Sequence, residues 1–193
     1  MMRARQCSLC GGVSDAEKYA RRVGLRYDQV TVIAESGGWY FAQDFTNTLR
    51  FVIAAVPVES AAQRCEADMA AIFRLAGADL DELASYGYTV ELQEFLQRHP
   101  IVVGRGTATG HAALAGRAVH IPDVLADPEY SRGEAQKAGR YRAVIAVPLM
   151  REGAVIGILV LLRANPGPFT LQQIKLAETF ADEAAIAVEA AVR

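Results

Sequence analysis

Glycine residues recur closely in "VVGRGTATGHAALAGRAVHIPD", residues 102–123, ahead of a short apolar segment. Backbone N–H groups of a glycine-rich turn at the start of a helix can hold a phosphate. Gly104, Gly106 and Gly110 are spaced one residue too widely for the dinucleotide fingerprint, however. His111-Ala112 occupies the place where a P-loop needs Lys followed by Ser or Thr. The stretch therefore gives no support for a nucleotide phosphate site.

A structural role accounts for the same residues. We expect Gly104 and Gly106 to form a turn, and Thr107 or Thr109 to cap a short helix over "GHAALAG". Gly116 should end that helix, because glycine adopts the left-handed conformation common at helix C-termini.

Two cysteines near the N-terminus, Cys7 and Cys10, have the spacing of half a zinc site. The sequence has no second C-x-x-C pair. The third cysteine, Cys65, is distant, and the histidines are scattered at His99, His111 and His120. We expect free thiols and no metal site.

Candidates for catalysis are isolated residues. "AESGG" around Ser36 approaches a nucleophile elbow, but strand-like residues follow it where the elbow needs a helix. His111 and His120 could act as general bases, although a histidine beside a buried strand is also a common hydrogen-bonded structural residue. No catalytic constellation emerges, and we expect the chain not to be an enzyme.

Composition limits the class of protein. The 193 residues are 52% hydrophobic and 22% charged, which is typical of a globular domain. The formal net charge of −2, without a basic stripe, argues against nucleic acid as a partner. No apolar run approaches the roughly 20 residues that span a bilayer, and no signal peptide is evident. We expect a cytoplasmic protein without a membrane partner.

The N-terminal quarter shows mixed patterns. A capping box at Ser14 predicts a helix to Val23, and β-branched and aromatic residues flanking Gly37-Gly38 predict a hairpin. Helical spacing from Thr46 to Arg64 is interrupted by Pro57.

Residues 68–142 alternate between strand and helix patterns. Two strands are predicted around a turn at 78–81, followed by a helix from Thr89 to Arg98. "RAVHIPD" reads as a strand closed by Pro122. Asp127-Pro128 predicts a turn, and Ser131 with Glu134 predicts the cap of a helix that ends at Gly139.

The C-terminal third gives the clearest pattern. Residues 143–162 read as a hairpin of nearly continuous apolar strands, which implies a central, doubly covered place in a sheet. Thr170 with Gln173 and a Phe169–Ile174 staple predict the start of a long helix. One stripe of that helix is rich in small residues: Ile174, Ala177, Ala181, Ala184, Val188 and Ala191. The stripe could pack on its own sheet or on a partner.

Three segments together resemble the GAF domain of bacterial histidine kinases and nucleotide cyclases: "GRGTATGHAALAGRAVHIPDVLADPEY", "AVIAVPLMREGAVIGILVLLR" and "PFTLQQIKLAETFADEAAIAVEAA". The resemblance implies an α+β fold, with an antiparallel sheet of five or six strands and helices on both faces. It implies a GAF-like sensor domain over residues 46–193, leaving 1–45 as an unassigned N-terminal extension.

The resemblance also implies a small-molecule pocket on one sheet face, roofed by residues 89–141. Candidate ligand contacts at this wall and roof are Thr109, His111, Ile121, Asp123, Tyr130, Tyr141 and Arg142. The implied function is a sensory or regulatory module in signal transduction, such as a two-component system. Its ligand and cofactor are unknown. Its output is expected in another chain, and the expected partners are a histidine kinase or other signalling protein and a second copy in a homodimer.

Specialised GAF chemistries fit less well. The cyclic-nucleotide signature matches at Asn165 and Phe169, but Pro166, Gln172 and Gln173 replace its lysine and acidic residues. Covalent bilin attachment needs a pocket cysteine, and none lies between Asp123 and Arg142. An enzyme resembling the GAF-type methionine sulfoxide reductase is the alternative function, although Cys65 precedes the first strand of the domain.

Overall fold

The computed structural model describes residues 31–35, 38–42 and 58–192. The chain divides into two units between Val52 and Ile53. In the first unit, β1 (Thr31–Glu35) and β2 (Gly38–Ala42) pair antiparallel, which confirms the two strands predicted there. The predicted helix at 14–23, the C-x-x-C pair, Ser36 and most of the 46–64 pattern lie outside the described residues.

The second unit is built on one six-stranded sheet in which every pairing is antiparallel. Its spatial order is β5-β4-β3-β8-β7-β6. The strands are β3 (Met69–Ala76), β4 (Asp79–Tyr86), β5 (Ile101–Val102), β6 (Val119–Ile121), β7 (Ala143–Arg151) and β8 (Ala154–Arg163). The strand predictions for this unit are confirmed, with the first turn at residues 77–78 instead of 78–81.

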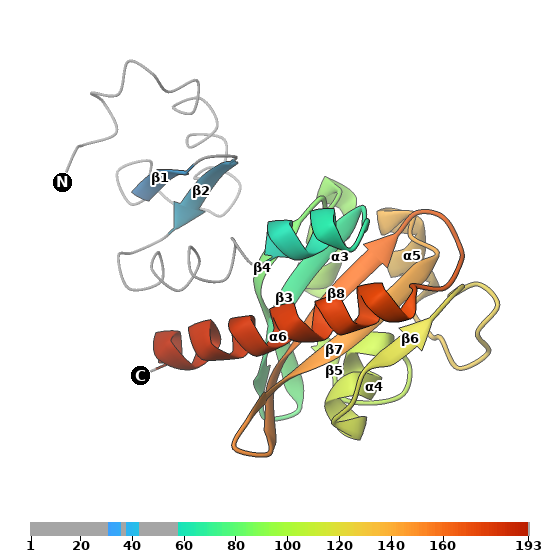
Figure 1. Cartoon of the computed structure of the whole chain (residues 1–193). Helices are drawn as coiled ribbons and strands as arrows, with labels where there is room; N and C mark the ends of the chain where they lie inside the picture. Colours follow the sequence, from blue (N-terminus) through green and yellow to red (C-terminus); the bar gives the residue numbers. More distant parts are fainter. Residues whose placement is uncertain (1–30, 36–37, 43–57, 193) are drawn as a thin grey trace. The chain divides into compact units, whose positions relative to one another are not determined.

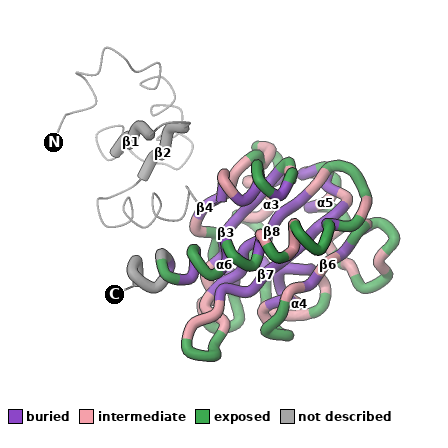
Figure 2. The backbone as a smooth tube through the Cα atoms, viewed as in Figure 1, coloured by how far each residue is buried: buried purple, intermediate pink, exposed green. Residues whose placement is uncertain are grey.

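The β7–β8 hairpin lies at the centre of the sheet and is buried along most of its length (Figure 2). Glu152 and Gly153 both have positive φ, as a two-residue type I′ turn requires. Ile145, Leu149 and Ile158 are fully buried. The uninterrupted apolar sequence of these strands is thus explained by cover on both faces.

Helices cover both faces of the sheet (Figure 1). The helical segment 58–64 and α6 (Leu171–Val192) lie on one face. The other face carries α3 (Val90–Arg98), α4 (Ala108–Ala115) and α5 (Gly133–Gly139). The described residues include no helix that is both long and apolar enough to cross a membrane.

Three of the predicted helix starts are confirmed by hydrogen bonds. The Thr89 hydroxyl accepts from the Leu92 backbone N–H, and the Thr107 hydroxyl accepts from that of Gly110. At α6, the Thr170 hydroxyl accepts from the backbone N–H of Gln173, while the Gln173 side-chain oxygen accepts from that of Thr170. Each cap satisfies an N–H group that the first helical turn leaves without a partner.

The predicted cap of α5 is wrong. Arg132 is the N-cap residue, and its side chain makes no capping bond. The Ser131 hydroxyl instead donates to the backbone carbonyl of Gly106, 25 residues earlier in the chain. A long-range contact has replaced the local one, while the predicted end at Gly139 is confirmed.

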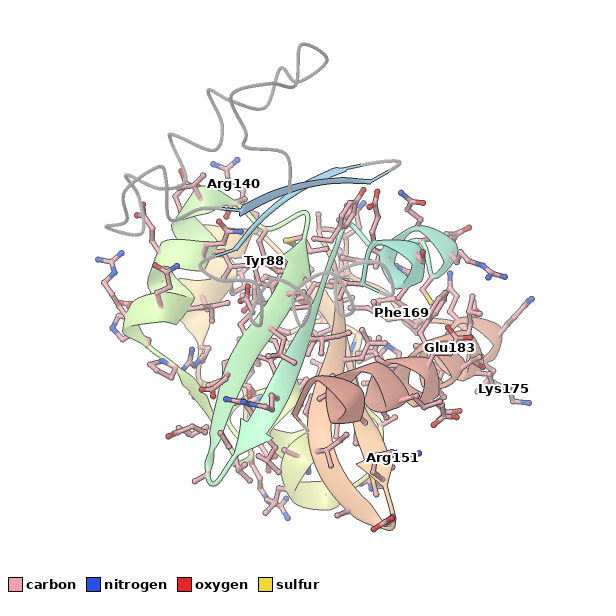
Figure 3. The ribbon with its side chains drawn as sticks, turned by 90° about the vertical axis from the view of Figure 1, so that its left-hand side faces the viewer. Tyr88, Arg140, Arg151, Phe169, Lys175 and Glu183 are labelled. Carbon is pink, nitrogen blue, oxygen red and sulfur yellow. The ribbon has the colours of Figure 1, made fainter. Side chains whose placement is uncertain are left out.

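The small-residue stripe of α6 packs on its own sheet. Ala177, Ala181, Ala184 and Val188 are each at most 3% exposed, and the helix lies against β7 and β8. Lys175 and Glu183 project from the opposite side of the helix (Figure 3). The described part of the stripe is therefore explained by packing against the sheet of its own chain. The predicted homodimer stays a prediction, and the stripe no longer supports it.

Candidate functional site

A cavity of about 40 Å³ lies between the sheet and the layer formed by α3, α4 and α5. A water molecule needs roughly 10–15 Å³ of such space, so there is room for a molecule of a few heavy atoms. The lining residues are Phe73, Tyr88, Leu92, Leu96, Ile101, Thr107, Ala108, Thr109, Tyr130, Arg132, Ala135, Tyr141, Val144, Val160 and Leu162.

The strands supply an apolar floor. Phe73 on β3, Val144 on β7 and Val160 on β8 belong to the buried core of this face. Alternation along each strand directs them toward the same side. In the roof, Leu92 is nearly fully buried and Ala135 is 1% exposed. Because these roof residues are small or apolar, an apolar space is left between the roof and the strands.

Two tyrosines form the polar part of the wall. The hydroxyls of Tyr130 and Tyr141 are 2.5 Å apart and share one hydrogen bond. Burial raises the pKa of both phenols, and the Arg132 guanidinium opposes that rise. Both hydroxyls therefore keep their protons at neutral pH. Because one proton suffices for the bond between them, the other is free to donate.

A third tyrosine, Tyr88, follows β4 and also lines the cavity. Burial raises its pKa well above the usual value, and the carboxylate of Glu82 adds to the effect. Figure 3 shows Tyr88 beside the sheet, beyond the end of β4. This phenol is likewise a neutral hydrogen-bonding group.

Arg132 is the one charged residue of the lining within the described chain. Its Nη1 donates to the His99 carbonyl at 2.8 Å, and its Nη2 donates to that of Pro100 at 2.5 Å. The guanidinium also lies 6.0 Å from the ring centroid of Phe95. Arg132 therefore ties the start of α5 to the end of α3.

The glycine-rich stretch packs closely in the roof. A Cβ on Gly106 would lie 2.3 Å from the Ser131 hydroxyl, and one on Gly110 would lie 2.3 Å from the Val102 carbonyl. Side chains are excluded at both positions by neighbours that the fold brings close. This explains the glycines by close contact and confirms that Thr107 caps α4 and Gly116 ends it.

The structure brings three of the seven predicted ligand contacts to the cavity: Thr109, Tyr130 and Tyr141. His111 lies two residues beyond Thr109 on α4, a rotation of about 200° that directs it elsewhere. Ile121 is 9% exposed and belongs to the same core cluster without lining the cavity. The cavity gives His111 and Ile121 no support as ligand contacts.

Asp123 and Arg142 form an ion pair outside the cavity lining. Arg142 Nε donates to one Asp123 carboxylate oxygen at 2.8 Å, and Nη2 donates to the other at 2.5 Å. These bonds hold the pKa of the Asp123 carboxyl below its usual range. The pair joins the end of β6 to the start of β7, which indicates a structural role for both residues.

Sequence reasoning missed Arg132, Tyr88 and most of the apolar lining. The clearest available signal was the aromatic content around "YGYT", residues 86–89, just before the first roof helix. Arg132 gave no signal, because its partners are carbonyls of residues more than 30 positions away.

The cavity lining contains no His, Cys, Asp, Glu or Lys residue within the described chain. Nor do the described residues contain a cluster of His, Cys, Asp or Glu able to hold a metal ion. Cys65 is buried on the α6 face, where its thiol lies 3.7 Å from the Gln173 carbonyl. Burial raises the pKa of that thiol. Within the described chain, the cavity lining therefore offers no histidine, carboxylate, thiol or amine that could act as a general base near neutral pH.

The GAF domain family model matches residues 52–188, more than half of the chain. The chain belongs to the GAF domain family. This confirms the resemblance found in the sequence and the antiparallel α+β fold expected from it. A search among curated proteins found no match.

Solved structures of other GAF domains share this fold. A GAF domain/HD domain protein from Geobacter sulfurreducens has a TM-score of 0.66 at 13% identity, over 77% of this chain and 99% of that one. A domain of a putative two-component sensor histidine kinase from Sinorhizobium meliloti has a TM-score of 0.57 at 18% identity, over 71% and 88%. The likeness establishes the fold of this GAF domain.

Some of the similar structures are enzymes. The type II free methionine-R-sulfoxide reductase from Thermoplasma acidophilum has a TM-score of 0.61 at 19% identity, over 76% of this chain and 96% of that one. The GAF fold therefore carries both regulatory domains and catalysts, and the function of this chain depends on its own site.

Proposed function

We propose that this GAF domain is a sensory or regulatory module that binds a small molecule in the cavity beneath α3, α4 and α5. The observation that carries the proposal is the lining itself. It combines apolar walls with three neutral phenols and one guanidinium, and within the described chain it has no group that titrates near neutral pH. Such a lining suits recognition better than proton transfer.

The roof offers a route for a signal. Arg132 bonds to two carbonyls at the end of α3, and the neighbouring Ser131 bonds to Gly106 before α4. A ligand that contacts Arg132 therefore acts on the connections among all three roof helices. We place the response in this roof and assign its reception to a partner signalling protein, such as a histidine kinase, or to a second copy of the chain.

The alternative is an activity like that of the free methionine-R-sulfoxide reductases, favoured by the likeness to solved structures of such enzymes. It would require a reactive thiol in contact with the sulfoxide. The cysteine in the described part of the chain, Cys65, lies on the face opposite the cavity with a raised pKa, so its thiolate is disfavoured. Reduction of free methionine-R-sulfoxide with dithiothreitol, abolished by Cys65→Ser, would establish the alternative.

Native mass spectrometry of the protein purified from its own source tests the binding proposal. The protein should carry a non-covalent mass that denaturation releases. Ala135→Leu places a larger side chain in the cavity and should remove this mass. Ala115→Leu, at an exposed position on α4, should retain it. A folded Ala135→Leu protein that keeps the full extra mass would contradict the proposal.

A further inference from the structure

The charged group of the cavity, Arg132, offers only hydrogen-bond donors. Arg132 has five N–H groups, and its bonds to the carbonyls of His99 and Pro100 use two of them. The remaining three have no acceptor in the described part of the chain. Tyr130 and Tyr141 together have one hydroxyl proton beyond the one they share. These groups are suited to an acceptor that carries several lone pairs.

The charge of the lining is positive. Arg132 is its one charged residue in the described chain, and it acts electrostatically on both Tyr130 and Tyr141. The guanidinium and the tyrosine pair line the same small cavity, so one bound molecule could contact both. A negative charge would be stabilised here, whereas a positive charge would face an unmatched guanidinium.

The rest of the cavity is apolar and small. Leu92, Leu96 and Ile101 form one part of the wall, and the strand residues Val144, Val160 and Leu162 close the other. A space of about 40 Å³ excludes a nucleotide or a large ring system without rearrangement of the roof. The remainder of a ligand should thus be a short hydrocarbon group.

We propose that the ligand is a small organic acid, whose carboxylate is bound by Arg132 and the Tyr130–Tyr141 pair and whose short apolar chain lies against the strand floor. The inference rests on the proposed sensory function and names the chemical class of its ligand. Guanidinium and carboxylate are matched in geometry, because two parallel N–H groups meet two oxygens. Arg132 then joins the ligand to the carbonyls at the end of α3.

Binding of butyrate and of its neutral amide, butyramide, tests the charge requirement. The two probes have nearly the same shape, so their difference in affinity isolates the carboxylate. Titration calorimetry or ligand-observed NMR on the full chain should show butyrate binding about tenfold or more tightly than butyramide. Equal affinities, or binding of neither probe, would overturn the organic-acid proposal.

Variants locate the interaction. Arg132→Gln should reduce butyrate affinity about tenfold or more and leave butyramide nearly unchanged. Arg117→Gln, at an exposed position beyond α4, removes the same charge and should change neither affinity. Unchanged butyrate affinity in Arg132→Gln would overturn the assignment.

Tyr141→Phe tests the site while the hydrogen bonds from Arg132 to the carbonyls of His99 and Pro100 stay in place. It removes one hydroxyl of the pair and should weaken butyrate several-fold, with a folded protein by circular dichroism. Full butyrate affinity in this variant would exclude the tyrosine pair from the site. Two results together would reject the organic-acid ligand and keep the proposed sensory function. Butyrate would show no preferential binding and no dependence on Arg132 or Tyr141, while Ala135→Leu would still lose the non-covalent mass seen by native mass spectrometry.

Discussion

The two faces of the sheet are covered by different kinds of structure. One carries the short helical segment 58–64 and α6, a helix of 22 residues whose buried alanines lie close to β7 and β8. The other carries three helices of nine, eight and seven residues, joined by loops and tied by side-chain bonds to backbone carbonyls. Continuous close packing leaves no space for a ligand, whereas short tied elements enclose one.

The comparison assigns different roles to the faces. Small side chains on α6 let the helix approach the sheet and fix it there. In the roof, Arg132 and Ser131 hold neighbouring segments through a few polar bonds, which a ligand can replace or strengthen. We expect the α6 face to determine stability and the roof face to respond to binding.

The largest expected effect comes from a charge within the α6 packing. Ala184 is 1% exposed, and Ala184→Glu would bury a carboxylate without a partner. The domain should lose about 3–5 kcal/mol of unfolding free energy or fail to fold. Ile186→Glu, at a position 61% exposed on the same helix, should change stability by less than about 0.5 kcal/mol. A folded, dissociated Ala184→Glu monomer would show instead that the stripe contacts a partner.

The second-largest loss of stability is expected from shortening a core side chain on the cavity face of the sheet. Ile158 on β8 is fully buried, and Ile158→Ala should cost about 2–5 kcal/mol in denaturant melts. Ile186→Ala is the exposed control and should have little effect. A loss below about 1 kcal/mol for Ile158→Ala would mean that its side chain does not contribute to the core as described.

Close contact in the roof predicts a moderate effect. Gly110→Ala places a Cβ 2.3 Å from the Val102 carbonyl and should cost about 1–3 kcal/mol as α4 shifts. Gly133→Ala meets no atom within 4 Å and should be neutral or up to about 1 kcal/mol stabilising. Equal unfolding free energies for the two variants would remove the packing explanation for the glycine-rich stretch.

The smallest expected effect is a pH dependence at the α6 face. His120 Nε2 accepts a hydrogen bond from the Phe169 backbone N–H, which requires an unprotonated nitrogen. Burial and then the Arg163 charge lower its pKa. Because the unfolded chain takes up this proton first, stability is complete above about pH 6.5 and falls as pH decreases below it.

His120→Gln keeps an acceptor and removes the titration. In chemical denaturation across this pH range, the wild-type protein should therefore lose more stability on acidification than the variant. Parallel pH profiles would contradict the role of His120 as an obligatory acceptor.

Local patterns in the sequence predicted most elements of the GAF fold. The cap at Thr170, the helix that starts at Thr89 and the β7–β8 hairpin depend on residues a few positions apart, and all were confirmed. The α5 cap failed because Ser131 bonds to Gly106, a partner that only the folded chain brings near.

The cavity was predicted less completely for the same reason. Thr109, Tyr130 and Tyr141 line the cavity, but Asp123 and Arg142 satisfy each other where β6 ends and β7 begins. Sequence alone does not distinguish a polar residue available to a ligand from one already paired. Arg132 escaped notice because its partners, the carbonyls of residues 99 and 100, are set by the packing of α3 against α5.

Hydrogen–deuterium exchange tests most directly whether the roof is the responsive face. The comparison is between the protein purified with its native ligand and the same protein after unfolding, dialysis and refolding. Backbone amides of α3, α4 and α5 should gain protection in the loaded protein, while those of α6 and the β7–β8 hairpin should not change. Protection gained in α6 with no change over residues 90–139 would contradict the account.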